Sequence, residues 1–174
     1  DFGNPSEFQG TTNLSVSLFI KPDPVSGTST DIGVFGSGFK GSTSDRVWEI
    51  ARSDSDNQYF IMFFDSQNNR AIVTRTLPAD QWTHLVASWD NGTLTVYENG
   101  EQVGTDTTPN ATLNTDVDGF FMGRRPGANE FWSGALDDVR VYSTSVSEAR
   151  AESLYDMSPI GNLKLFNWSG PSQV

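Results

Sequence analysis

The fold is decided by residues 82–105, whose sequence reads WTHLVASWDNGTLTVYENGEQVGT. This stretch contains two Asn-Gly pairs, at positions 91–92 and 99–100. Asn-Gly is favoured in the type I′ turn that joins two antiparallel strands, because both central residues need a positive φ. Residues 93–98, between the pairs, have the length and alternation of one strand. The stretch therefore predicts three consecutive antiparallel strands.

Alternation of apolar and polar residues recurs on both sides of this meander. Residues 14–20 read LSVSLFI before a Pro-rich turn, and residues 47–52 alternate with Trp48 and Ile50 facing inward. Residues 59–64 are apolar on both faces, which indicates a central strand that is covered on both sides or faces a groove. Further strands are predicted at residues 32–35, 120–123 and 134–142.

Composition excludes several classes of protein. The chain has 174 residues, with 11 basic and 22 acidic side chains and a formal net charge of −11. Nucleic acid is therefore excluded as a partner, since phosphate binding needs clustered Lys and Arg. No run approaches 18 apolar residues, so no insertion into a membrane is expected. Cysteine is absent from the sequence, which excludes disulfides, thiol catalysis and thiolate zinc sites.

Length and pattern together predict one all-β domain with a short C-terminal helix. The helix is expected at residues 146–155, because Ser145 and Glu148 have the spacing of a capping box. The domain is expected to span residues 1–156. Residues 157–174 would form a linker followed by an extra strand or exit segment at residues 163–168.

Four stretches, in this order, resemble laminin-G-like domains of the concanavalin A-like lectin and glucanase class, to which the pentraxins are related. They are residues 14–22, 82–100, 120–123 and 131–142, followed by Ser147-Glu148 and Leu154-Tyr155. The resemblance implies a two-sheet antiparallel jelly-roll sandwich with Trp82, Val86 and Val96 in its core. The residues expected to be buried are Trp82, Leu85, Val96, Met122, Val139 and Val141. Compared with the family, the first strand is truncated, and residues 163–168 are expected to take its place.

The residues argue against catalysis. Laminarinase-type glucanases of this architecture carry an E-x-D-x-x-E strand, because one carboxylate acts as nucleophile and another as acid. The seven Glu of this chain are scattered without that spacing, and the sequence has neither a G-x-S-x-G elbow nor a glycine-rich phosphate loop. The single histidine, His84, lies within a predicted strand and is expected to be a hydrogen-bonded structural residue. The chain is therefore not expected to be an enzyme.

Asp137 is the candidate metal ligand. The resemblance implies that an aspartate at this position can hold a structural calcium ion together with backbone carbonyls of the N-terminal stretch. Glu7 or Asp1 would assist it. The residues leave an alternative open, in which Asp137 caps a sheet edge or pairs with Arg140 or Arg150.

The candidate ligand site lies on two loops. Asp56 and Asn57 resemble the aspartate–asparagine pair of pentraxins, which meets an acidic loop and binds calcium and then ligand. Here that loop has Arg124 and Arg125 where carboxylates are expected, which disfavours a double-calcium site. The rim that remains consists of Asp56, Asn57, Arg124, Arg125, Asn129 and Trp132.

Such a rim could bind an acidic or amide-bearing sugar. Arginine binds carboxylate or sulfate with two parallel bonds, and Trp132 offers a face for stacking. The alternative is an Asp56–Arg124 salt bridge that closes the loop, with Trp132 packed into the core.

Two functions follow. The first is a non-catalytic, lectin-like carbohydrate-binding module of a secreted, cell-surface or virion protein. The second is a structural or adhesion domain, such as a virion decoration, a receptor-binding component or a segment of a surface protein. In that case the sandwich contacts other protein subunits, with strand exchange or oligomer contacts at its edges. Both functions place the chain outside the cell, on the cell surface or on a virion.

Overall fold

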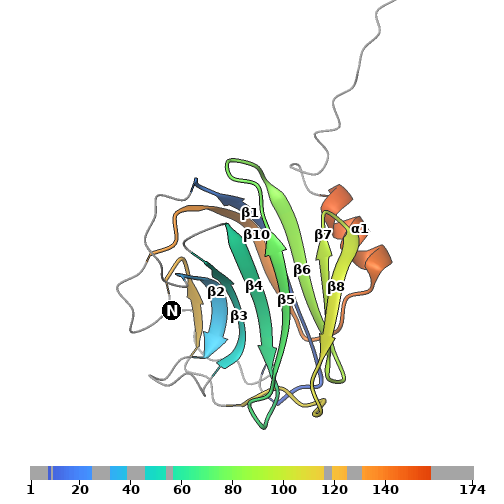
Figure 1. Ribbon diagram of the computed structural model, residues 1–174. Helices are drawn as coiled ribbons and strands as arrows, with labels where there is room; N and C mark the ends of the chain where they lie inside the picture. The colour runs from blue at the N-terminus through green and yellow to red at the C-terminus, as the bar shows by residue number, and fades with distance from the viewer. Residues whose placement is uncertain are drawn as a thin grey trace, which may run out of the picture.

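In the computed structural model, the described part of the chain forms two five-stranded antiparallel sheets and one helix (Figure 1). The structure describes residues 8, 10–24, 32–38, 46–53, 57–115, 119–124 and 131–157. The first sheet contains, in spatial order, β10 (Gly134–Tyr142), β1 (Asn13–Pro22), β6 (Thr83–Asp90), β7 (Thr93–Glu98) and β8 (Glu101–Thr107). The second contains β5 (Arg70–Thr76), β4 (Gln58–Phe64), β3 (Arg46–Arg52), β2 (Ile32–Gly38) and β9 (Phe120–Met122). The predicted two-sheet jelly-roll sandwich is confirmed.

The two Asn-Gly pairs form the turns of the predicted meander. Asn91 and Gly92 have φ values of 46° and 90°, and Asn99 and Gly100 have φ values of 52° and 90°. All four residues thus adopt the positive φ that a type I′ turn requires. Strands β6, β7 and β8 are consecutive antiparallel neighbours, as the sequence predicted.

The interior side of β6 carries Leu85, Ala87 and Trp89, all of which belong to the main core. Trp89 is fully buried and stacks on Phe63 of the facing sheet at a centroid distance of 5.8 Å. The predicted burial of Trp82 is wrong, because this side chain is 36% exposed. Trp82 precedes the strand, and the inward positions of β6 are the odd-numbered ones.

Other core predictions have mixed outcomes. Val96 is buried in the main core as predicted, but Val86 lies on the opposite face of β6, in the cluster that α1 (Glu148–Met157) covers. Val139 and Val141 are half-buried. The predicted burial of Met122 is wrong: it is 38% exposed, because β9 is the outermost strand of its sheet.

Strand β4 is apolar on both faces, as its sequence indicated. Its interior face belongs to the main core, whereas Met62 and Phe64 belong to a separate cluster on the outer face. These two side chains are 5% and 6% exposed. The guanidinium of Arg46 lies 5.7 Å from the Phe64 ring, so the outer face is covered by a charged side chain at that point.

Strand β5 was not predicted. Ala71 and Val73 face the core, and Ile72 belongs to the cluster on the outer face of the sheet. The inward side chains are small or short, so the strand carries little apolar bulk for its length.

The helix begins two residues later than expected. The N–H of Val146 donates to Ser88 Oγ at 2.8 Å, which holds this residue against the first sheet. The first helical bond then runs from the N–H of Ala151 to the carbonyl of Ser147 at 2.9 Å. Figure 1 shows α1 beside β7 and β8, on the outer face of the first sheet.

The two long sides of the sandwich differ. On one side, which we call the closed side, β5 contacts β7 and β8. On the other, which we call the open side, β9 and β10 flank an apolar groove lined by Phe35, Phe120, Met122, Val139 and Val141.

No helix in the described ranges is long and apolar enough to cross a membrane. The predicted strand at residues 163–168 lies outside the described residues, so the domain boundary near residue 156 stays a prediction.

Candidate ligand-binding rim

Several strand ends meet at one end of the sandwich, which we call the rim. In the first sheet Pro22, near the end of β1, pairs with Gly134 at the start of β10. In the second sheet Arg52, at the end of β3, pairs with Tyr59 of β4. The rim also includes the turn between β3 and β4 and the residues that precede β10.

The buried guanidinium of Arg52 joins three parts of the rim. Arg52 is 3% exposed, and its Nη2 donates to the carbonyl of Asp23 at 3.0 Å and to Oδ1 of Asn57 at 2.6 Å. Its Nη1 donates to the carbonyl of Ser133 at 3.5 Å. A hydrogen bond from Ser133 Oγ to the carboxylate of Asp23 adds a second link. Because hydrogen bonds to charged groups are the stronger ones, Arg52 braces these loop ends against one another.

The side chain of Trp132 lies half-buried against the core. Its Nε1–H donates to the hydroxyl of Tyr59 at 3.3 Å. Burial raises the pKa of Tyr59, while the bond from Trp132 and the nearby charge of Arg52 act in the opposite direction. Gly134 allows this packing: its φ is +149°, and a Cβ there would lie 2.5 Å from the Trp132 ring and from the carbonyl of Lys21. The indole ring is therefore anchored, and only part of its surface is left for a ligand.

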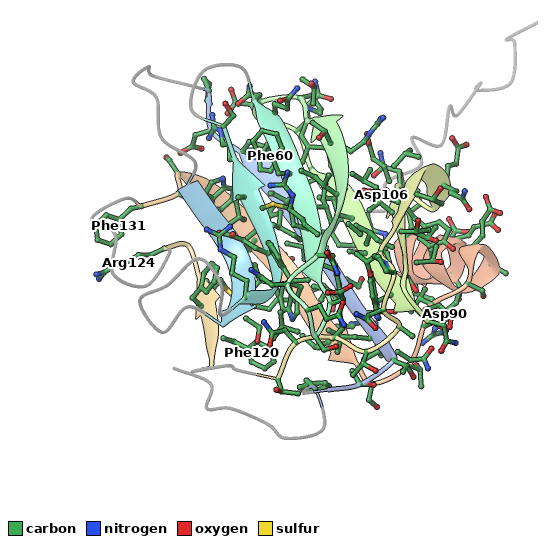
Figure 2. All side chains as sticks on the ribbon, turned by 60° about the horizontal axis from the view of Figure 1, so that its bottom comes forward. Phe60, Asp90, Asp106, Phe120, Arg124 and Phe131 are labelled. Carbon is green, nitrogen blue, oxygen red and sulfur yellow. The ribbon has the colours of Figure 1, made fainter. Side chains whose placement is uncertain are left out.

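Arg124 and Phe131 form an exposed pair next to this anchor. Their backbones are joined by an isolated antiparallel bridge. The guanidinium carbon of Arg124 lies 5.4 Å from the centroid of the Phe131 ring, within the range of a cation–π contact (Figure 2). Phe131 is 66% exposed, the largest exposed fraction among the exposed large apolar side chains of the described residues. The pair offers an aromatic surface and a positive charge at one place.

Three of the six predicted ligand residues are described. They are Asn57, Arg124 and Trp132, whereas Asp56, Arg125 and Asn129 lie outside the described residues. Asn57 and Trp132 belong to one network through Arg52 and Tyr59, and Arg124 lies beside Phe131. The sequence analysis missed Arg52, Tyr59 and Phe131 as rim residues. The signal that could have found Phe131 is its position directly before Trp132 in the predicted rim loop.

Asp137 lies on β10, and its carboxylate is exposed. Its Oδ1 accepts the backbone N–H of Asp138 at 2.8 Å, and Arg140 pairs with Asp138 at 2.7 Å rather than with Asp137. Within the described ranges, no group of three or more His, Asp or Glu side chains could hold a metal ion. Calcium takes six to eight oxygen ligands, so the described donors do not by themselves fit it. Asp1 and Glu7 lie outside the described residues, and the calcium site stays a prediction.

His84 is a buried structural residue, as expected. Its Nε2 lies 2.9 Å from Ser17 Oγ, and its ring stacks on Phe19 at a centroid distance of 4.6 Å. Burial lowers the pKa of His84 to about 4, with Asp138 raising it and Arg140 lowering it further. The imidazole is therefore neutral at pH 7, and it stacks on Tyr155 of α1 at a centroid distance of 6.0 Å, on the outer face of the first sheet.

Asp65 is a buried carboxylate with a structural role. Its oxygens accept the backbone N–H groups of Gln67, Asn69 and Asn110 at 2.9, 2.8 and 3.3 Å, and the side-chain amide of Asn69 as well. Desolvation by itself raises the pKa of Asp65, but these hydrogen bonds outweigh it and hold the pKa below its usual value. The carboxylate oxygens of Asp65 are thus engaged in the hydrogen bonds that hold this turn.

These features define a lectin-type jelly-roll sandwich with a braced rim of loops. The family model described as the concanavalin A-like lectin/glucanases superfamily matches residues 1–151. The chain belongs to this superfamily, which confirms the resemblance found in the sequence.

Relatives share the fold at low sequence identity. The adhesion G-protein coupled receptor V1 of Danio rerio is 23% identical over 150 residues, which cover 83% of this chain and 2% of that receptor. Domain 4 of AbnA, an extracellular arabinanase from Geobacillus stearothermophilus solved with arabinotriose, is 24% identical with a TM-score of 0.61. That match covers 86% of this chain and 69% of the other.

A third similar structure is the ligand-binding domain of botulinum neurotoxin serotype D in complex with N-acetylneuraminic acid. It is 14% identical with a TM-score of 0.66, and the match covers 83% of this chain and 36% of that chain. The chain thus spans a small part of the receptor and about a third of the neurotoxin domain.

Proposed function

We propose that this chain is a non-catalytic glycan-binding domain of a protein that acts outside the cell, on a cell surface or on a virion. The observation that carries the proposal is the pair formed by Arg124 and Phe131. An aromatic ring that is 66% exposed lies 5.4 Å from a guanidinium, on a rim that Arg52 braces from within. A rigid scaffold with recognition groups on its loops is the usual arrangement of a binding site.

The chemistry of this pair fits an acidic oligosaccharide. The face of Phe131 can pack against the apolar face of a sugar ring, and Arg124 can bind a carboxylate or sulfate with two parallel hydrogen bonds. Figure 2 shows Arg124 on the opposite side of the molecule from Asp90 and Asp106. A ligand that carries negative charge would be attracted to this place by the guanidinium of Arg124. Asp56, Asn57, Arg125, Asn129 and Trp132 are the proposed neighbouring ligand residues.

Two further findings support the proposal. Two similar structures, a neurotoxin ligand-binding domain and an arabinanase domain, were solved with N-acetylneuraminic acid and with arabinotriose. Among the described residues, the groups that resemble catalytic ones are engaged elsewhere: His84 is buried beneath α1, and Asp65 accepts the bonds of a turn. Both observations favour binding without catalysis.

The experiment is a titration of the chain with a sialylated oligosaccharide and with its neutral, desialylated form. We expect the sialylated sugar to bind more tightly, and we expect Phe131→Ala and Arg124→Gln each to weaken binding at least tenfold. Arg70→Gln serves as the control, because Arg70 is an exposed arginine at the start of β5, remote from the rim. Equal affinities for all four proteins, or no binding by the wild type, would overturn the proposal.

A second candidate function is adhesion through protein contacts. The observation in its favour is the relative in Danio rerio, which is an adhesion receptor. The same titration distinguishes the two functions, because a domain that only contacts proteins would bind neither sugar.

Calcium at Asp137 can be tested alongside: a chelator should lower the melting temperature of the wild type but not that of Asp137→Ala.

A further inference from the structure

The open side of the sandwich contains a groove that the rim does not use. The groove has a volume of about 360 Å³. Its described lining is apolar and comes from both sheets, with Phe35, Phe120 and Met122 from the second and Val139 and Val141 from the first. Water in such a groove finds few polar partners, so an apolar group that replaces the water is favoured.

The groove offers depth between the sheets rather than a broad surface. A stable protein–protein interface buries about 800 Å² on each partner. Of the large apolar side chains that are exposed in the described residues, Met122 at 38% is the one that lines the groove, whereas Phe35 is 3% exposed. This shape favours a slender apolar group over the face of a folded protein.

The lining and the volume together indicate an alkyl chain. A sugar would lose the water on its hydroxyl groups without gaining hydrogen bonds from the five lining side chains, which is costly. At about 30 Å³ for each water-sized group, the groove has room for roughly twelve methylenes. A single alkyl chain of that length fits this space.

A positive charge lies close to the groove. Met122 is the last residue of β9 and Arg124 follows two residues later, so their Cα atoms are less than about 8 Å apart. Arg124 is exposed, and it can bind a carboxylate with two parallel hydrogen bonds. The groove and this guanidinium therefore suit a molecule with an apolar chain and an anionic head.

We propose that the groove binds an amphipathic anion of the fatty-acid type. Its alkyl chain lies between β9 and β10, and Arg124 binds its carboxylate. This inference does not rest on the proposed glycan site, because the five lining residues belong to neither loop of the rim and the two sites share Arg124 alone. Binding of a fatty acid without binding of any sugar would leave this proposal standing.

The test is a calorimetric titration with monomeric fatty acids, below their micellar concentrations. We expect the affinity to rise about fourfold for each methylene added between octanoate and dodecanoate, because each buried methylene adds a similar hydrophobic increment. Dodecanol, which has the same chain without the charge, should bind at least tenfold more weakly than dodecanoate. Arg124→Gln should lose this preference for the anion and bind dodecanol as the wild type does.

Two methionines provide matched variants. Met122→Glu places a negative charge in the groove and should weaken the binding of dodecanoate at least tenfold. Met157→Glu, at the end of α1, is the control and should bind as the wild type does. Met122 and Met157 are 38% and 56% exposed, so both variants are expected to fold, which thermal melts would check.

Several results would overturn the proposal. An affinity that does not depend on chain length would place the alkyl chain outside the groove, and equal binding of dodecanoate and dodecanol would remove Arg124 as the partner of the head. Binding to phosphatidylglycerol vesicles without binding of free dodecanoate would assign the groove to a membrane surface. A wild-type dimer that Met122→Glu converts to a monomer would assign it to a second copy of the chain.

Discussion

On the closed side of the sandwich, polar groups join the two sheets directly. Arg75 Nε lies 2.8 Å from Glu98 Oε2, and the N–H of Ile72 donates to the carboxylate of Asp106 at 2.9 Å. On the open side, β9 and β10 are separated by an apolar groove. Hydrogen bonds and ion pairs fix one partner and one register, whereas an apolar groove specifies mainly a volume. The closed side therefore determines how the sheets align, and the open side has room for a ligand.

The largest loss of stability is expected for a substitution in the interior, between the closed side and the open side. Trp89 is fully buried, stacks on Phe63 and donates its Nε1–H to the carbonyl of Ala111 at 2.8 Å. We expect Trp89→Ala to lower the free energy of unfolding by about 3–5 kcal/mol, as measured by urea denaturation. Trp82→Ala is the control and should cost less than about 1 kcal/mol, because Trp82 is 36% exposed. Equal losses would contradict the register of β6.

Acid should destabilise a third region, the face of the first sheet under α1. This loss should begin at a higher pH than any loss on the closed or the open side. The pKa of His84 is about 4 in the folded chain, against 6.5 for an exposed histidine, because the ring is buried. The unfolded chain therefore binds the proton first. The contribution of His84 is complete above pH 6.5 and falls by about 3 kcal/mol as the pH drops to 4.

His84→Gln is the test of this pH dependence, because glutamine can still hydrogen-bond but does not titrate in this range. Its free energy of unfolding should vary less than that of the wild type between pH 6.5 and 4. Asp65 affects stability at lower pH than His84. Its pKa lies below the usual 3.8, so its contribution to the free energy of unfolding is lost only under more acidic conditions. Parallel pH profiles for wild type and His84→Gln would show that the imidazole is not the group responsible.

Matched glycine variants compare the two sides directly. A Cβ on Gly104, on the closed side, would lie 2.7 Å from Cγ1 of Val73. Gly104→Ala should therefore cost about 1–3 kcal/mol by overpacking. Gly123 follows β9 on the open side and has a φ of +71° with no atom within 4 Å of an added Cβ. Gly123→Asn should cost less than about 1 kcal/mol, since Asn tolerates this conformation. A larger fall in melting temperature for Gly123→Asn than for Gly104→Ala would mean that the closed side is loosely packed.

The smallest effect is expected for the ion pair on the closed side. Arg75 and Glu98 are partly exposed, with side chains 33% and 18% accessible. A double-mutant cycle with Arg75→Gln and Glu98→Gln should give a coupling of about 0.5–1 kcal/mol that decreases in high salt. A coupling that stays constant in 1 M salt (about a 3 Å Debye length) would indicate that the pair is shielded from solvent.

The strands were predictable where one local signal was sufficient. The Asn-Gly pairs gave β6, β7 and β8, and the inward positions of Trp48 and Ile50 followed from alternation in β3. A local signal did not show which alternate positions of β6 point into the core. The strand is covered by the second sheet on one face and by α1 on the other, so residues at both sets of alternate positions are buried, and the outward set mixes Val86 with the polar His84 and Ser88.

The rim could be predicted only in outline. The sequence indicated the two loops, but Arg52 acts through backbone carbonyls of Asp23 and Ser133, which lie 29 and 81 residues away. Any residue supplies a carbonyl, so such a contact leaves no signature in the sequence. Phe131 and Arg124 likewise meet because a bridge joins their backbones at the base of a loop, which depends on the position of β9.

The place of β1 between β6 and β10 has a consequence for how the chain is made. Residue Ser15 of β1 pairs with Tyr142 of β10, the last strand among the described residues. At 5–20 residues per second, the ribosome would take roughly 6–24 s to synthesise the residues from the end of β1 to the end of β10. During that time β1 has β6 as its only partner among the strands that will flank it, and its other edge is bare. Nascent chains arrested before β10 should therefore be captured by chaperones, and release should coincide with the emergence of the last strand.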